Sequence, residues 1–295
     1  MDMRSLLHEP GLALIVGNGI NRYGNAPDTN AWNALLTALA AKHLPASLRS
    51  VPAGISLTEF YDLLELKWQS TSDARTLQME FCELMAKWQP YEHHKRIVQW
   101  AKRSRAPILT TNFEETLSEA GQLKLYRAKK GGFTDYYPWE TYFGEKALDD
   151  PATEFGVWHI NGMQRYHRSV RLGLTHYMGC VERARGWLHR GNEKRLFAGK
   201  DVRDWEGTSS WLHVVFNCPL LIFGLALNED EVFLRWLLIE RARYFRKFPD
   251  RRKQAWYVYA GAPNSDGKQY FLEGVGIEPV RVSSHGKIYG RSVWI

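Results

Sequence analysis

Four short polar segments of the chain carry residue types that could bind a nucleotide and move a proton. They are Gly17, Asn18, Gly19, Ile20 and Asn21; then Thr110 and Asn112; then His159 and Asn161; and last Gly224, Leu225, Asn228 and Asp230. Each segment follows an apolar run of the kind that forms a buried strand. Because open α/β sheets hold ligands at the carboxyl ends of their strands, we expect the four segments to form one site.

The first segment joins an apolar run at residues 12–16 to a glycine-rich turn. Gly17, Gly19 and Gly24 would let the backbone approach a ligand and leave free N–H groups at the start of a helix, where a phosphate is favoured. The spacing G-x-G-x-x-x-x-G differs from the dinucleotide fingerprint G-x-G-x-x-G. From these residues alone, a plain strand-to-helix turn explains the segment as well as a phosphate site does.

Structural roles compete with functional ones in the second and third segments. Asn112 could contact a ligand, or it could cap the helix expected directly after it. His159 and Asn161 would point to the same face of a strand at residues 155–162, because side chains alternate along a strand. A lone histidine is more often a structural group than a catalyst, but the position of His159 at a strand end beside Asn-Gly favours a catalytic role.

Strand and helix patterns alternate at both ends of the chain. Strands are predicted at residues 12–16, 107–112, 155–162, 170–174, 219–227, 255–260 and 278–282, with short strands in a long loop at 129–150. Helices are predicted at residues 31–43, 58–68, 73–88, 92–103, 113–119, 175–190, 205–217 and 231–248. This order predicts an α/β fold with a doubly wound, mostly parallel sheet in one domain of residues 1–295. Residues 44–104 and 163–217 are interpreted as largely helical insertions that form a smaller subdomain.

Composition excludes several classes of protein. The chain has 295 residues, and no apolar run reaches the roughly 18 to 20 residues that span a bilayer. The first ten residues lack the apolar segment of a secretory signal, so we expect a cytoplasmic protein with no membrane partner. Cys82, Cys180 and Cys218 are scattered, which argues against a disulfide framework or a zinc knuckle and for buried or idle thiols.

The net charge of +7 is concentrated in residues 241–253, with the sequence RARYFRKFPDRRK. Such a run is usually a solvated helix face and loop, and binding of nucleic acid or another acidic partner is the alternative.

In their order along the chain, the four segments resemble those of the SIR2-like family, the sirtuin-fold proteins that consume NAD in bacteria. The resemblance covers nearly the whole chain and implies a sirtuin-type, Rossmann-like fold. It implies that residues 17–21 hold the NAD phosphates, that Asn112 orients the nicotinamide ribose, and that residues 224–230 contact the nucleotide. Thr110 and Ala260, the latter beside the adenine, complete the nucleotide contacts that we expect.

This sequence departs from the family pattern at three positions. Glu114 stands where Asp is usual, and Ala226 stands where the family carries a hydroxyl. The family's catalytic histidine usually comes directly before a glycine, a position that Asn161 occupies here, with His159 two residues earlier. Either His159 acts through a shifted geometry, or the site lacks the usual base, because an amide does not accept a proton near neutral pH.

The resemblance implies an NAD glycohydrolase that releases nicotinamide and ADP-ribose, as antiphage SIR2-like effectors do, with NAD as substrate and no metal. Sirtuin deacylases typically carry a four-cysteine zinc module, which three scattered cysteines do not supply. The alternatives are a non-catalytic module that binds NAD or ADP-ribose, a sirtuin-like deacylase, and a nucleic-acid-binding protein. A homo-oligomer, and an activating protein or nucleic acid bound through residues 241–253, stay open as partners.

Overall fold

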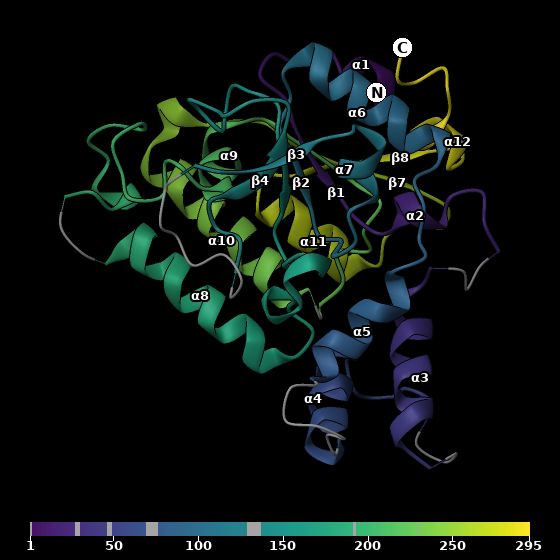
Figure 1. Cartoon of the computed structure of the whole chain (residues 1–295). Coiled ribbons are helices and arrows are strands. Elements are labelled where there is room, and N and C mark those ends of the chain that lie inside the picture. Colours follow the sequence, from purple (N-terminus) through teal and green to yellow (C-terminus); the bar gives the residue numbers. More distant parts are fainter. Residues whose placement is uncertain are drawn as a thin grey trace.

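The computed structural model describes residues 2–26, 30–45, 49–68, 76–128, 137–190, 193–229 and 231–295. Six parallel strands form most of one sheet: β1 (Ala13–Val16), β2 (Ile108–Thr110), β5 (Val157–His159), β6 (Leu220–Phe223), β7 (Ala255–Ala260) and β8 (Glu278–Val282). Two antiparallel strands extend one edge: β3 (Lys124–Arg127) and β4 (Thr141–Gly144). The order is β3-β4-β5-β2-β1-β6-β7-β8 (Figure 1), which confirms the predicted α/β fold with a mostly parallel sheet.

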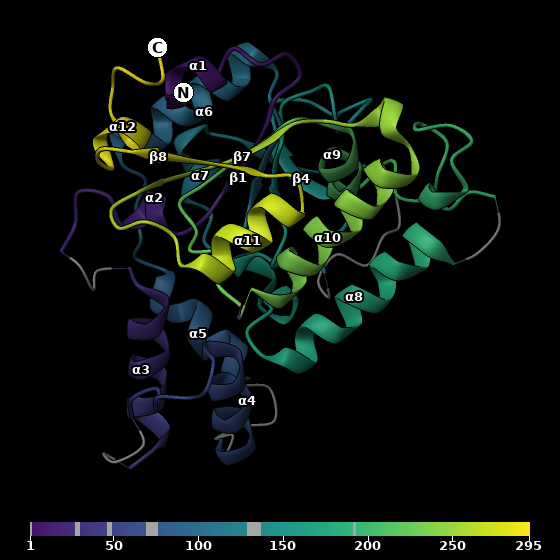
Figure 2. The ribbon, with the colours of Figure 1, turned by 180° about the vertical axis from the view of Figure 1, so that it is seen from behind.

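Helices cover both faces of the sheet (Figures 1 and 2). One face packs against α8 (Leu174–His189), α9 (Trp211–Asn217), α10 (Val232–Lys247) and α11 (Asp266–Gly274). The other face packs against α1 (Met3–Leu6), α6 (Glu92–Ser104), α7 (Thr116–Ala120) and α12 (Gly286–Tyr289). Alternate residues of β1 serve the two cores, since Ala13 and Ile15 belong to the first and Leu14 and Val16 to the second. Burial on both faces explains why the central strands are uninterrupted apolar runs.

A third hydrophobic core lies outside the sheet layers. It is formed mainly by α3 (Trp32–His43), α4 (Leu57–Lys67) and α5 (Leu77–Met85), which project from the body of the molecule (Figure 1). The described residues of 44–104 contain α4, α5 and α6 and no strand, although α6 packs on the sheet. The described residues of 163–217 contain α8, α9 and the 3-10 turns Gln164–Ser169 and Leu196–Ala198. A further 3-10 turn is Pro249–Arg251.

Several predicted elements differ from the structure. Residues 170–174 are not a strand, because Val170 and Leu172 pack into the third core and α8 starts at Leu174. The helix predicted at 205–217 starts only at Trp211, and the helix predicted at 113–119 starts at Thr116. Strand β3 was not predicted, because it is half exposed at the sheet edge and carries little apolar pattern.

Two expectations from composition can be compared with the structure. Cys82, Cys180 and Cys218 are buried free thiols, as the sequence predicts. No helix in the described part of the chain is long and apolar enough to cross a bilayer.

Candidate functional site

The strand order reverses at β1, which places the turn after it at the topological switch point of the sheet. The chain leaves β1 for β2 on one side and later returns to β6 on the other side. In open α/β sheets the ligand crevice lies at this point, outside the carboxyl ends of the strands. The four polar segments follow β1, β2, β5 and β6, which are neighbours in the order β5-β2-β1-β6. The structure therefore brings the four segments to one edge of the sheet.

The glycines after β1 allow two strand ends to pack backbone against backbone. The N–H of Gly17 donates to the carbonyl of Phe223 at 3.0 Å, and the N–H of Gly19 donates to that of Gly224 at 2.6 Å. A Cβ added at Gly17 would lie 2.4 Å from the Cβ of Leu225. Gly224 has a φ of 76°, in the left-handed region. These glycines therefore serve the contact between the ends of β1 and β6.

The helix after this turn, α2 (Gly19–Arg22), has only four residues. The N–H groups of Gly19, Ile20 and Asn21 donate to backbone carbonyls at 2.6, 3.3 and 3.0 Å. The prediction that the turn leaves free N–H groups for a phosphate is therefore wrong for these three residues. A phosphate at this edge must be bound by other groups.

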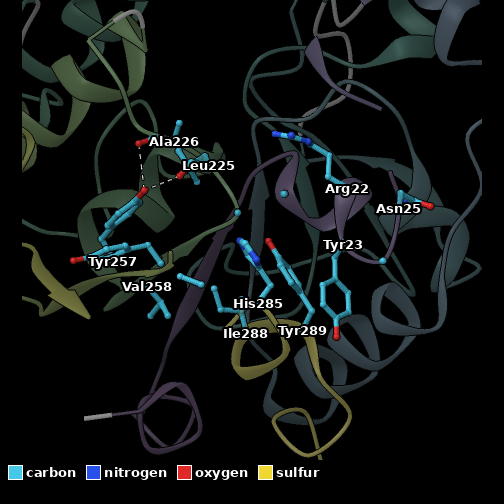
Figure 3. Close-up of a pocket in the computed structure, with 15 residues that line it drawn as sticks. Arg22, Tyr23, Asn25, Leu225, Ala226, Tyr257, Val258, His285, Ile288 and Tyr289 are labelled. Atoms are coloured by element: carbon cyan, nitrogen blue, oxygen red, sulfur yellow. Dashed lines mark hydrogen bonds between the residues drawn. The ribbon is translucent and has the colours of Figure 1, made fainter. Parts of the chain in front are cut away.

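A cavity of about 620 Å³ opens beside the turn, beyond the carboxyl ends of β6 and β7 (Figure 3). Its volume lies in the range of pockets that hold small-molecule ligands. Four of the predicted nucleotide contacts line it: Gly19, Gly224, Leu225 and Ala260. The other lining residues are Arg22, Tyr23, Gly24, Asn25, Ala226, Tyr257, Val258, Tyr259, His285, Ile288 and Tyr289.

Aromatic side chains of this cavity were missed from the sequence. Tyr257 and Tyr259 stack with ring centroids 5.7 Å apart, and their alternate positions at the end of a strand were a usable signal. His285 and Tyr289, at the centre of Figure 3, come from the region of α12 and carried no sequence signal. The hydroxyl of Tyr257 donates to the carbonyl of Leu225 at 2.9 Å and so fixes the turn after β6.

A smaller cavity of about 90 Å³ lies between the sheet edge and helices α3 to α5. Asn161 and Thr111 line it on the side of the sheet. On the other side are aromatic rings, with Trp32 stacked on Phe81 at a centroid distance of 5.9 Å. The remaining lining residues are Leu36, Leu57, Thr58, Phe113, Arg171, Leu172, Tyr177 and Glu231.

His159 lines neither cavity. Its side chain is fully buried and packs edge-on against Phe143 at a centroid distance of 5.6 Å. Its Nδ1 lies 2.9 Å from the carbonyl oxygen of Asn112, which only accepts, so Nδ1 carries the proton. Its Nε2 is buried without a partner in the described part of the chain. Burial lowers the pKa of the imidazole, so His159 stays neutral and holds the Asn112 backbone.

The expected common face of His159 and Asn161 is therefore wrong. Strand β5 ends at His159, and the N–H of Gly162 folds back to the carbonyl of His159 at 3.3 Å. Asn161 lies in this turn and donates through Nδ2 to the carbonyl of Thr111 at 3.3 Å. The structure thus places the amide at the smaller cavity and the imidazole in the core.

Asn112 is fully buried and belongs to a network of polar side chains. Its Nδ2 donates to Oε1 of Glu114 at 3.2 Å, and Nδ2 of Asn21 donates to the same oxygen at 2.8 Å. Within the described residues, Oδ1 of Asn112 and Oε2 of Glu114 are buried without partners. The helix-cap interpretation of Asn112 is wrong, because α7 begins at Thr116 with Glu115 at the cap position.

His94 fixes the far end of this network. The N–H of Tyr91 donates to its Nδ1 at 3.0 Å, so the proton resides on Nε2, which donates to Oδ1 of Asn21 at 3.1 Å. Burial lowers the pKa of His94 to about 3, so the ring stays neutral near pH 7. The amide orientation of Asn21, and through it the position of Glu114, is set by a group that sequence analysis did not identify.

Glu114 is expected to make the stability of the protein depend on pH. Burial raises the pKa of its carboxyl from an ordinary 4.5 to about 7. Between these values the folded chain binds more protons than the unfolded chain, so the Glu114 contribution to stability falls as pH rises from about 4.5 to 7. We expect the unfolding free energy of wild type minus that of Glu114→Gln to fall by roughly 3 kcal/mol across this window. Denaturant unfolding at several pH values measures this difference.

The comparison with Glu114→Gln isolates one group. His94 and the other buried histidines have lowered pKa values, so their contribution to stability rises with pH near pH 6. This contribution is the same in wild type and Glu114→Gln and cancels in the difference. A wild-type-minus-variant difference that stays flat from pH 4.5 to 7 would show that Glu114 does not titrate in this window.

The remaining predicted contacts lie away from both cavities or outside the described residues. Asn18 and Ile20 are buried, and Thr110 donates through Oγ1 to the carbonyl of Val16 at 3.0 Å. Asn228 is exposed beside the turn after β6. The prediction for Asp230 lies outside the described residues.

No protein-family model matches the chain, and a search of curated proteins finds none with significant similarity. We therefore infer the function from the fold and the two cavities.

Proposed function

We propose that this chain is a SIR2-like NAD hydrolase that binds NAD across the two cavities and releases nicotinamide. The main support is the pair of cavities on either side of the switch-point turn, with Asn161 in the wall of the smaller one. The larger cavity accommodates the adenosine half, with Tyr257 and Tyr259 beside the base. The nicotinamide ribose then lies at the smaller cavity, next to the position where the family carries its histidine. At about 90 Å³ this cavity is below the size of a ligand pocket, so it must widen to admit the sugar.

The proposed reaction makes modest demands on the protein. The bond between the ribose C1′ and the nicotinamide nitrogen breaks with its electron pair on nicotinamide, and water adds to the resulting oxocarbenium-like carbon. The protein must hold the ribose, exclude bulk water and position the attacking water. Trp32 and Phe81 supply an apolar wall, and the Asn161 amide is suited to hydrogen-bond a ribose hydroxyl or the water.

A proton acceptor is also available at the smaller cavity. Glu231 lines it, and we assign to its carboxylate the proton lost by the attacking water. Sequence analysis did not identify Glu231, since one acidic residue at a helix start carries no catalytic pattern. The proposed hydrolase therefore uses an amide and a carboxylate in place of the histidine.

Nicotinamide release from NAD by the purified chain tests this proposal. We expect release by the wild type and a loss of roughly 100-fold in Glu231→Gln, the size typical of removing a general base. Glu229→Gln is the matched control, because Glu229 is exposed two residues away and does not line the cavity. Equal rates in the two variants would remove Glu231 from the mechanism, and no release by wild type would contradict hydrolysis.

The burial of His159 favours a second candidate, a module that binds NAD or ADP-ribose without turnover. The imidazole contacts neither cavity, and Asn161 cannot serve as a base in its place. Calorimetry with NAD and ADP-ribose that gives saturable binding, together with no nicotinamide release, would favour this function over hydrolysis.

Asn161→His is expected to raise the rate of nicotinamide release by about tenfold or more. The substitution puts a general base of suitable pKa into the wall of the smaller cavity. High-performance chromatography of nicotinamide gives the rate, and Asn228→His controls for an added surface histidine. If Asn161→His abolishes ADP-ribose binding and nicotinamide release alike, the amide itself is needed, and the equivalence of this position with the family's histidine is wrong.

A further inference from the structure

The basic run of residues 241–253 separates into two sets of side chains in the structure. Four of its seven basic residues have partners within the fold: Arg241 on backbone carbonyls, Arg243 on Glu240, Lys247 on the carbonyl of Phe197, and Arg251 on Tyr244 and Gly199. The other three, Arg246, Arg252 and Lys253, are exposed and make no ion pair within the described ranges. Only the second set is free to bind an anion.

These three side chains line one cavity of about 450 Å³. The cavity lies between the carboxyl half of α10 and the end of α11, two helices that lie side by side on one face of the sheet (Figure 2). Lys253 comes just before β7, and Gly276 comes just before β8. The cavity is therefore at the amino edge of the sheet, roughly 20 Å, one length of β7, from the carboxyl-edge site. We call it the amino-edge pocket.

A buried cation adds to the positive potential of the amino-edge pocket. Arg241 is in its wall, and the side chain is only 2% exposed. Its Nε and Nη2 donate to the carbonyls of Val215, Cys218, Lys253 and Gln254 at 2.9 to 3.2 Å. Carbonyl dipoles satisfy its donors but leave its net charge in place. Burial lowers its pKa to about 9, so it remains protonated near pH 7.

The opposing charge in the amino-edge pocket is small. Glu273 is the one carboxylate among its lining residues, and it accepts from Nε2 of Gln269 at 2.5 Å. Gly276 has a φ of 72°, and a Cβ there would lie 3.3 Å from Nη2 of Arg252. The glycine thus leaves room for the guanidinium at the mouth of the pocket. Guanidinium groups match phosphate oxygens in geometry and bind them by charge-assisted hydrogen bonds.

The shape of the amino-edge pocket favours a compact ligand over a nucleic-acid strand. A volume of about 450 Å³ is that of a small-molecule pocket. Single-stranded nucleic acid is usually bound on exposed aromatic rings that stack on its bases. Phe245, the one aromatic residue in this wall, is buried and cannot serve in this way.

We propose that the amino-edge pocket binds a compact, multiply charged phosphate group, at a site separate from the carboxyl-edge cavities. Arg246, Arg252 and Lys253 contact the phosphate oxygens, and the buried guanidinium of Arg241 adds to the positive potential of the pocket. The proposal does not depend on NAD binding or hydrolysis.

Calorimetric titration of the full chain with inorganic tripolyphosphate tests this site. We expect saturable binding that weakens with added salt, and a loss of about tenfold or more in Arg252→Ala and in Lys253→Ala, since each substitution removes a charge-assisted hydrogen bond to the phosphate. Lys247→Ala is the control, because this lysine belongs to the same run and donates instead to the carbonyl of Phe197. The three residues are exposed, so each variant should fold, and thermal unfolding checks this.

Two results would overturn the proposal. One is an affinity for tripolyphosphate that is absent, or that is unchanged in Arg252→Ala and Lys253→Ala. The other is a single-stranded DNA oligonucleotide that binds more tightly than tripolyphosphate and loses its affinity in the same two variants. That result would make the surface a nucleic-acid site.

Discussion

Asn112→Ala is expected to slow nicotinamide release from NAD by about 100-fold, the size of effect seen when the residues that position a substrate shift by about 1 Å. Asn112 lies between Thr111 and Phe113, which both line the smaller cavity. Its backbone carbonyl is held by His159 and its amide by Glu114. Asn112 is fully buried and lines neither cavity, so loss of its amide acts indirectly, by disturbing the wall that Thr111 and Phe113 form.

Asn228→Ala is the control for this prediction, because Asn228 is of the same type but is exposed and makes none of the buried contacts of Asn112. Initial rates at saturating NAD measure the effect, and circular dichroism checks the fold of each variant. A rate for Asn112→Ala within twofold of the Asn228→Ala rate would exclude Asn112 from the reaction.

Arg241→Met is expected to lower the unfolding free energy by about 3 kcal/mol or more. The guanidinium donates to four backbone carbonyls: Val215 in α9, Cys218 just before β6, and Lys253 and Gln254 just before β7. Methionine keeps much of the side-chain length but donates nothing. The carbonyl of Gln254 keeps the N–H of Leu220 as a donor at 3.0 Å, and each buried carbonyl left without a donor costs on the order of 1 to 3 kcal/mol. Denaturant unfolding gives the difference directly.

Arg252→Met provides the matched comparison, since Arg252 is exposed and belongs to the same basic run. We expect its effect to stay within about 0.5 kcal/mol of wild type. Equal effects of the two substitutions would mean that Arg241 does not hold the amino ends of β6 and β7 together.

The central strands could be predicted because burial on both faces demands a continuous apolar run. Leu220–Phe223 and Ala13–Val16 have no polar residue, and both are fully buried between the two helical layers. The common location of the four polar segments at one edge of the sheet could also be predicted from the sequence. Each segment comes after a strand, and parallel strands end at a common edge. Residues 170–174 show the limit of this reasoning, because Val170 and Leu172 alternate like a strand while packing against helices.

The details of the site depended on where each strand ends and on contacts between distant residues. His159 and Asn161 are two positions apart, but β5 stops at His159, so strand alternation no longer applies to Asn161. In the turn after β1, the glycines pack closely against the turn after β6, and N–H groups donate to its carbonyls. The two turns are more than 200 residues apart in the chain. His285 and Tyr289 reach the larger cavity from α12, and no local pattern marks them as ligand contacts.

The most direct test of the proposed NAD site is a crystal structure of the chain soaked with NAD. We expect the adenine in the cavity beside Tyr257 and Tyr259, and the nicotinamide ribose, or the ADP-ribose product, beside Asn161 and Glu231. At saturating NAD, empty cavities at the carboxyl edge, or a nucleotide bound only in the amino-edge pocket, would contradict this expectation.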